Sequence, residues 1–295
     1  MNALERGFLL LTSRLGNPER KPLTVSQLRV LAGRMQVMEA PLEEKELSVS
    51  ELRTIGYGLE MSERILHLLA QEEELDYYLQ KGKREGCFPI TRVNPLYPLI
   101  LRQRLGLDSP GCLWIKGDVS LLSAPAISLV GSRDIQTENA SFAEAVARHA
   151  ASEGLVLVSG NARGADRTAQ RVCLESGGQV ISVVADELCK QSCGERILYV
   201  SEDDYDAPFS SQRALSRNRC IHALGRVTFV AQSGYGKGGT WDGTIKNLHN
   251  GWSPVACFRD GSEASVQLEQ MGAFLVTEAD LPDFSGLLSA ELRLF

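Results

Sequence analysis

The stretch LVLVSGNARGAD, residues 155–166, contains the main signals for the fold of this chain. Its first part, Leu155–Ser159, is an apolar run without polar alternation, as expected of a strand buried on both faces of a parallel sheet. Glycines at positions 160 and 164 then form a turn, and helix-compatible residues follow it. The stretch therefore predicts a strand, a tight turn and a helix start, the basic unit of an α/β sheet.

The same pattern recurs on both sides of this stretch. Amphipathic segments such as Ser141–Glu153, stopped by Gly154 at the position after a helix end, alternate with further apolar runs. These runs are Ala126–Val130, Val180–Ala185, Ile197–Ser201, Val227–Ala231, Pro254–Phe258 and Phe274–Thr277, and a short strand, Cys112–Lys116, is expected in the connecting stretch before them. The alternation predicts a Rossmann-like α/β domain with a doubly wound, mostly parallel sheet.

The first part of the chain has a different periodicity. Apolar residues such as Leu28, Leu31 and Met35 recur at helical spacing, and no catalytic signature accompanies them. We expect a small helical N-terminal domain over residues 1–85, which serves packing or interaction. The Rossmann-like domain is predicted over 86–280, and a short helical tail over 281–295.

Composition narrows the classes of function. A formal net charge of -6 argues against a protein that coats nucleic acid through bulk positive charge, so any such site must be a local basic cluster. The odd number of scattered cysteines, seven, is typical of reduced thiols in a cytoplasmic protein. No apolar run approaches the ~20 residues of a membrane span, and no signal peptide is evident. Neither the cysteines nor the four histidines show a metal-ligand spacing.

Three strand-to-helix turns combine glycine, hydroxyl and cation: Gly131–Arg133, Ser159–Asp166 and Ser233–Thr240. Glycine permits close approach of a ligand, and the N–H groups at a helix start attract anions. One such turn is usually structural, but three in one sheet favour a phosphate site at the carboxyl ends of the strands. Asp166 is expected to cap backbone N–H groups. The spacing Gly234-x-Gly236-x-x-Gly239 matches a dinucleotide fingerprint, but it lies outside the first βαβ unit, which argues against nicotinamide binding.

A basic helix adds to these turns. Arg213 and Arg217 share a helix face on which no nearby acid is expected, which suggests an anionic partner. Exposed arginines there should contribute little to stability. The predicted phosphate-binding residues are Gly131, Ser132, Arg133, Ser159, Gly160, Arg163, Gly164, Asp166, Arg213, Arg217, Asn218, Arg219, Lys237, Gly238, Gly239 and Thr240. Because no nucleophile–base pair and no metal-ligand set is visible, we expect no catalytic residue, no metal and no cofactor. Phosphate contacts and few aromatic residues predict binding nearly independent of base sequence.

The order of these motifs resembles the DprA/Smf family of DNA-processing proteins. The matching elements are Tyr97–Pro98, Gly131–Arg133, the Ser159–Asp166 loop, Gly177–Gly178 and Arg217–Arg219. The resemblance implies a non-catalytic, cytoplasmic homodimer that binds single-stranded DNA and helps load a RecA-type recombinase during natural transformation. The chain departs from the family pattern at Ala169–Gln170, where a histidine is usual, at Ala185–Glu187, in the acidic run Glu202–Asp206, and in ending without a winged helix.

A nucleotide ligand is the alternative. Proteins of the LOG (lysine-decarboxylase-like) type carry a Gly-Gly-x-Gly-Thr loop, to which Gly238–Asp242 is a partial match. On that interpretation the chain is a nucleotide-binding enzyme or a sensor of a nucleotide-derived ligand. The shape of the site distinguishes the two, because a DNA strand needs a groove with several separated anion positions, whereas a nucleotide needs one enclosed pocket.

Overall fold

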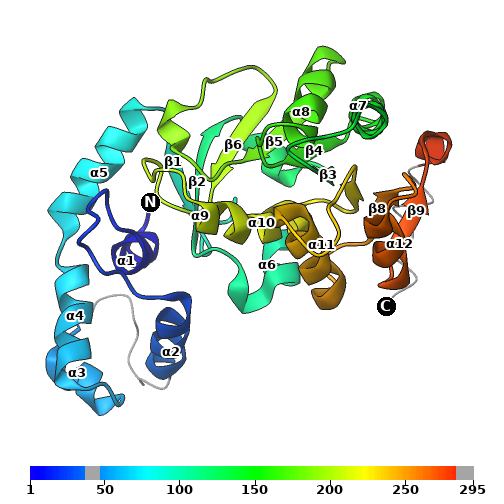
Figure 1. Ribbon diagram of the computed structural model, residues 1–295. Helices are drawn as coiled ribbons and strands as arrows, with labels where there is room; N and C mark the ends of the chain where they lie inside the picture. The colour runs from blue at the N-terminus through cyan, green and yellow to red at the C-terminus, as the bar shows by residue number, and fades with distance from the viewer. Residues whose placement is uncertain (37–46, 284–295) are drawn as a thin grey trace.

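The computed structural model describes residues 1–36 and 47–283 of the chain (Figure 1). Its centre is a nine-stranded sheet in the order β1-β2-β6-β5-β4-β3-β7-β8-β9. The strands are β1 (Phe88–Thr91), β2 (Cys112–Gly117), β3 (Ala126–Val130), β4 (Val156–Ser159), β5 (Gln179–Val183), β6 (Ile197–Ser201), β7 (Thr228–Val230), β8 (Val255–Phe258) and β9 (Phe274–Val276). β1 and β2 pair antiparallel, as do β2 and β6, while every other pairing is parallel. The predicted mostly parallel α/β fold is confirmed.

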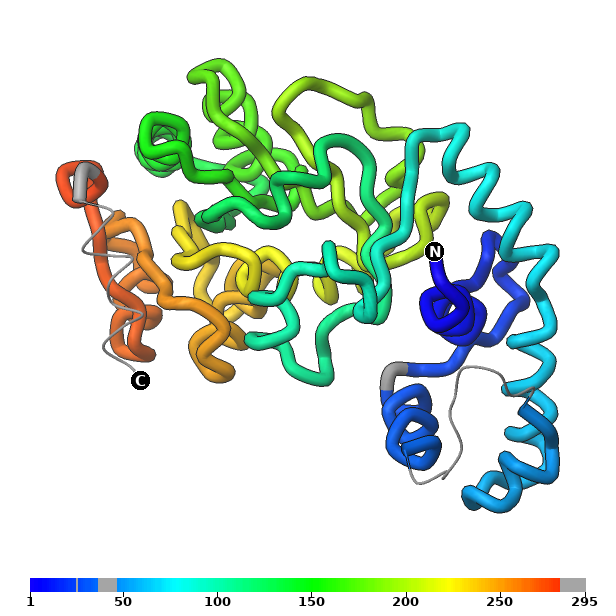
Figure 2. The backbone as a smooth tube through the Cα atoms, turned by 180° about the vertical axis from the view of Figure 1, so that it is seen from behind, coloured from blue at the N-terminus to red at the C-terminus, as the bar shows by residue number. Residues whose placement is uncertain are grey.

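Helices pack on both faces of the sheet, and the N-terminal helices lie at its β1–β2 end (Figure 2). Five precede it: α1 (Ala3–Thr12), α2 (Val25–Met35), α3 (Val49–Thr54), α4 (Leu59–Leu69) and α5 (Glu72–Arg84). The others are α6 (Leu99–Leu105), α7 (Thr137–Ser152), α8 (Ala165–Glu175), α9 (Ser211–Ser216), α10 (Asn218–Leu224), α11 (Gly239–Asn250) and α12 (Glu263–Gln270), with short 3₁₀ turns between elements. None of the helices in these described ranges is long and apolar enough to cross a membrane.

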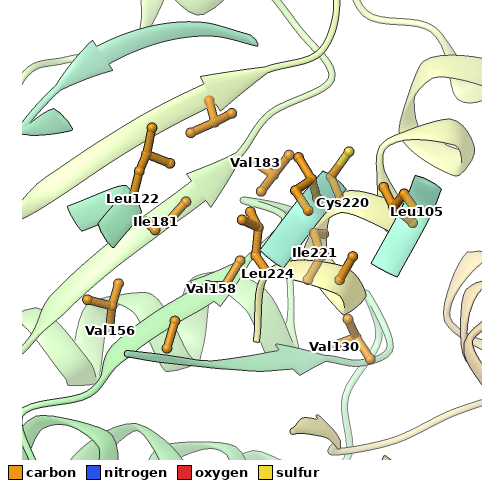
Figure 3. Packing of buried hydrophobic residues seen from close by; sticks show 14 of the residues in the cluster. Leu105, Leu122, Val130, Val156, Val158, Ile181, Val183, Cys220, Ile221 and Leu224 are labelled. Carbon is orange, nitrogen blue, oxygen red and sulfur yellow. The ribbon is translucent and has the colours of Figure 1, made fainter. Parts of the chain in front are cut away.

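The strands are apolar on both faces because each face has its own core. In β4, Val156 and Val158 point into the cluster under α6 and α10, whereas Leu157 points into the cluster under α7 and α8. Figure 3 shows the first of these clusters, where Leu224 of α10 packs near Val158 and Ile181. Successive side chains of a strand alternate between faces, so a strand covered by helices on both sides needs apolar residues at every position.

The chain order creates a switch point beside β3. From β3 the sheet grows through β4, β5 and β6 in one direction, and through β7, β8 and β9 in the other. β3 is hydrogen-bonded to both β4 and β7, with Ile127 opposite Leu157 and Val130 opposite Val230. The loops that follow β3, β4 and β7 therefore emerge side by side, at the place where ligands bind in doubly wound sheets.

The N-terminal helices gather at the β1–β2 end of the sheet (Figure 1). Tyr78 of α5 stacks on Tyr205 at a ring-centre distance of 4.5 Å, and Trp114 of β2 meets Tyr205 edge-on at 4.8 Å. Leu9 and Leu10 of α1 belong to the same buried cluster. The helices are thus fixed to the sheet by an apolar and aromatic contact. The boundaries 1–85, 86–280 and 281–295 stay predictions, and residues 284–295 of the predicted tail lie outside the described residues.

Candidate phosphate-binding groove

Two adjoining hollows open at the switch point. The larger, of about 470 Å³, is lined by the loop after β3, by α9 and α10, and by the glycine loop before α11. The smaller, of about 280 Å³, is lined by the loop after β4, with Asp186 and Phe209 on its other side. Arg133, Ala162 and Arg217 line both hollows. We call the pair of hollows joined by these three residues the Arg217 groove.

Arg217 lies at the join between α9 and α10 and is buried, with 6% of its surface exposed. Its guanidinium rests against Gly160, where a Cβ atom would overlap Nη1. Its Nε atom is buried and has no hydrogen-bond partner within the described part of the chain. Burial lowers the pKa of Arg217, while the charge of Asp166 opposes that shift. A buried cation with an unused N–H donor is a strong reason to expect an anion in the groove.

Asp166, at the start of α8, is a buried acid whose charge acts on this cation. Its Oδ2 accepts a hydrogen bond of 3.2 Å from the backbone N–H of Ala162, in the preceding loop. Burial raises the pKa of Asp166, and the positive charge of Arg217 and the Ala162 hydrogen bond counteract the rise. Asp166 thus bonds a backbone N–H, as expected, and in addition provides a counter-charge for Arg217.

The loops after β3 and β4 fit closely together. Ala165 donates its backbone N–H to the Ser132 carbonyl at 3.1 Å. Gly164 has a φ of +84°, and a Cβ atom there would collide with the carbonyls of Ser132 and Arg133. The Ser132 hydroxyl is engaged locally, since it donates to the Asp134 carbonyl and accepts from the Asp134 N–H, both at 3.1 Å. Arg133 is exposed and faces both hollows.

The third loop presents the amino end of α11 to the larger hollow. Gly238, with a φ of +88°, precedes the helix and supplies no side-chain cap. The Thr240 hydroxyl donates to the Gly131 carbonyl at 2.9 Å, and Asn218 Nδ2 donates to the Gly239 carbonyl at 3.0 Å. Lys237 is exposed beside the same hollow. The first N–H groups of a twelve-residue helix and a lysine therefore face the space next to Arg217.

Arg163 lies at the exposed margin of the smaller hollow. Its guanidinium forms an ion pair of 2.5 Å with Asp134, and the two side chains are 74% and 85% exposed. Such an exposed pair contributes little to stability. A phosphate that enters the hollow can therefore compete with Asp134 for the arginine.

Four predicted residues do not line the groove: Gly164, which packs against the loop after β3, and Ser159, Arg213 and Arg219. Ser159 is fully buried, and its hydroxyl accepts a hydrogen bond of 2.6 Å from Gln170, which occupies the position where the family usually has histidine. Arg213 pairs with Asp203 at 3.4 Å, and Arg219 pairs with Glu202 at 2.7 Å. The expectation that no acid lies near Arg213 was wrong, because the run Glu202–Asp206 lies against this side of α9 and α10.

Phe209 and His222 are among the groove residues that the sequence analysis missed. Phe209 is 55% exposed beside Arg217 in the smaller hollow. His222 lines the larger hollow and is buried, with Asn247 Nδ2 donating to its Nδ1 at 3.2 Å. Burial, reinforced by the charge of Arg217, lowers the pKa of His222 to about 3, so its ring is neutral. His222 lies four residues after Asn218, so on a helix the two residues share a face, and this spacing could have identified it. No sequence signal identified Phe209.

No group of three or more His, Cys, Asp or Glu side chains in the described ranges is arranged to hold a metal ion. The Arg217 groove is lined by cations, backbone N–H donors and glycines, by the acids Asp166 and Asp186, and by apolar side chains such as Phe209 and Leu215. The arrangement suits an anionic ligand with more than one phosphate.

Comparison with known proteins gives a consistent assignment. Residues 89–281 match the family model of DNA recombination-mediator protein A. The DNA processing protein DprA of Streptococcus pneumoniae is 30% identical over 183 residues, which cover 58% of this chain and 64% of that protein. Protein Smf of Escherichia coli is 26% identical over 188 residues, which cover 59% of this chain and 50% of the relative. The match therefore spans between half and two thirds of these relatives.

Solved structures agree on the fold. The crystal structure of DprA from Streptococcus pneumoniae superposes with a TM-score of 0.75 at 24% identity, over 96% of this chain and 99% of that one. A structure of DNA processing protein A from Helicobacter pylori, described for its single-stranded DNA binding mode, superposes with a TM-score of 0.56 at 21% identity, over 71% and 97%. The family model covers most of the sheet and its loops, and the chain belongs to the DNA recombination-mediator protein A family.

Proposed function

We propose that this DNA-processing protein binds single-stranded DNA through its phosphates in the Arg217 groove, without catalysis of its own. The observation that carries the proposal is the buried guanidinium of Arg217, whose Nε has no partner in the described residues and which separates two hollows. The Helicobacter pylori relative, described as binding single-stranded DNA, supports the ligand class. From the family we also propose a homodimer and a RecA-type recombinase as partner.

Two connected hollows favour a strand over a single nucleotide. The larger hollow offers Lys237 and the amino end of α11, the smaller offers Arg163, and Arg133 and Arg217 lie between them. Successive phosphates of one strand can thus meet separate cations. A nucleotide stays the second candidate, because a hollow of about 470 Å³ is large enough for a small ligand.

Opposite effects are expected at Arg163 and Asp134. Arg163→Ala should weaken binding of single-stranded DNA similarly for all sequences, and should reduce the log–log salt slope by about 0.7 if one phosphate contact is lost. Asp134→Asn removes the competing carboxylate of the 2.5 Å ion pair, so it should strengthen binding. Both residues are exposed, and melting temperatures should barely change.

The measurement is a salt titration of a mixed-sequence oligonucleotide, its duplex and free nucleotides against the wild type and both variants. Unchanged affinity and slope in both variants would remove Arg163 from the site. Absence of DNA binding, together with a nucleotide that raises the melting temperature, would favour the nucleotide alternative.

Phe209 is expected to stack on a base. The ring is 55% exposed at the wall of the smaller hollow, next to the cations that hold the backbone. Loss of one stacked base costs about 1–3 kcal/mol, so Phe209→Ala should weaken binding roughly tenfold, while Phe209→Trp should preserve it. Because the stacking is separate from phosphate neutralisation, the salt slope should stay unchanged. Tyr77→Ala, at an exposed aromatic residue of α5, is the matched control. Equal affinity of the two alanine variants would refute the stacking contact.

A further inference from the structure

A second and larger hollow, of about 900 Å³, lies between the N-terminal helices and the β2 side of the sheet. It is lined by α1, α2, the segments around Arg92 and Leu107, and the loop after β6. None of its lining residues belongs to the Arg217 groove. We call it the helical cleft.

Six arginines line this cleft. Arg213 and Arg219 are paired with acids, and the other four are Arg14, Arg29, Arg92 and Arg102. Arg14 donates to the Pro18 carbonyl and Arg92 to the Gly106 carbonyl, which are neutral partners. Arg29 is 3.9 Å from Asp108, and both side chains are well exposed. Within the described ranges, no carboxylate lies within ion-pair distance of Arg14, Arg92 or Arg102. In a protein with a net charge of -6, such a group of cations is a local exception.

The acids of the cleft already have partners. Glu202 is paired with Arg219 at 2.7 Å, and Asp203 with Arg213 at 3.4 Å. Asp204 accepts hydrogen bonds from the Ser13 hydroxyl at 2.7 Å and the Arg14 N–H at 2.8 Å. Asp206 accepts one from the Tyr78 hydroxyl at 2.7 Å and lies 3.6 Å from Lys81 Nζ. The charges of Glu202 and Asp203 are thus balanced by Arg219 and Arg213, and the four other arginines outnumber the two remaining carboxylates, Asp204 and Asp206.

Apolar side chains complete the lining. Phe8 and Leu28 contribute to the wall, and Leu107 and Val93 are 53% and 39% exposed. Sites for single-stranded nucleic acids combine apolar surface with cations, because the bases pack on the apolar surface and the phosphates bind the cations.

The cleft and the Arg217 groove are separated by a single short helix. Arg213 and Ser216 of α9 line the cleft, whereas Ala214 and Leu215 of the same helix line the groove. In the same way, Arg217 lines the groove and Arg219, two residues later, lines the cleft. A ligand that leaves the groove over α9 therefore enters the cleft.

We propose that the helical cleft binds the continuation of the DNA strand held in the Arg217 groove, with the four arginines contacting its phosphates. This proposal rests on the proposed function. It makes the N-terminal helices part of the DNA site and predicts that a long strand contacts both parts of the chain. An acidic peptide is the competing occupant. DNA is favoured because the same strand can occupy the adjoining Arg217 groove and the cleft.

The test compares oligonucleotides of about 5 and about 20 nucleotides, lengths that span the range of single-strand binding sites. The cleft variant is Arg29→Ala/Arg102→Ala, which removes two exposed cations. The control, Arg53→Ala/Arg84→Ala, removes two exposed arginines that line neither hollow. We expect the cleft variant to bind the short strand like the wild type. It should bind the long strand roughly tenfold more weakly, with a salt slope reduced by about 1.4.

The outcomes separate the two proposals. If the cleft variant and the control bind the long strand equally well, while Arg163→Ala weakens binding, the cleft proposal fails and the groove stands. If the wild type binds neither strand, both proposals fail. A labelled oligoglutamate peptide provides a second readout: binding that the cleft variant loses, and that the long strand does not displace, would make the cleft a peptide site and overturn the inference.

Discussion

Arg217→Ala should destabilise the folded protein and abolish its binding of DNA. The side chain is buried against Gly160 beside the buried Asp166, so its removal leaves a carboxylate without its counter-charge. Loss of one partner of a buried charge pair typically costs about 3–5 kcal/mol. The sequence-based expectation that this arginine is exposed and contributes little to stability was wrong. Urea unfolding and single-strand titration of the variant measure the two effects.

Gly160→Ala separates binding from stability. Its new methyl group would occupy the place of the Arg217 guanidinium, which lies at the end of a flexible side chain and can move. We expect binding to fall by at least tenfold, with a smaller loss of stability than in Arg217→Ala. Gly58→Ala, at a glycine with a φ of -73° and open space around it that lines none of the hollows, controls for the general cost of a glycine-to-alanine change. If Gly160→Ala binds DNA as tightly as the wild type, the position of this guanidinium is irrelevant to binding.

His222 should make the fold sensitive to acid. Its folded-state pKa is about 3, against about 6.5 in an unfolded chain. Between these values the unfolded chain binds a proton that the folded chain excludes. The stabilising contribution is therefore complete above pH 6.5 and is lost as the pH falls toward 3. From pH 7 to pH 5 this one residue should remove about 2 kcal/mol from the free energy of unfolding.

The measurement is the free energy of unfolding of the wild type, His222→Gln and His249→Gln at several pH values. The slope between pH 7 and pH 5 should flatten in His222→Gln, whatever its absolute stability. It should remain in His249→Gln, whose ring is exposed. A wild-type slope in His222→Gln would show that the buried imidazole does not control the acid transition.

The sheet could be predicted from the sequence because burial on both faces leaves a simple pattern. Ala126–Val130 and Ile197–Ser201 were predicted at their observed bounds, since an uninterrupted apolar run ends where a strand leaves the core. β1 was missed because it is a four-residue edge strand that contains Pro89, and proline normally argues against a strand.

The site was harder to predict because side-chain direction depends on neighbours that are distant in the sequence. The glycine turns predicted the three loops. No local signal showed that Ser159 is hydrogen-bonded to Gln170 or that Arg219 pairs with Glu202. Arg217 and Arg219 are separated by one residue and face different hollows. The break between α9 and α10 that divides them was not visible in the sequence, where the segment was expected to form one helix.

The hydrogen bonds that tie the three loops together bear on the energetics of binding. The Ala165 N–H donates to the Ser132 carbonyl, the Thr240 hydroxyl to the Gly131 carbonyl, and the Asn218 amide to the Gly239 carbonyl. Each loop is therefore hydrogen-bonded to another element in the absence of ligand. Such a site is preorganised, and little conformational entropy is lost in ordering the backbone on association. The entropic cost of complex formation then falls mainly on the flexible polymer that enters the groove.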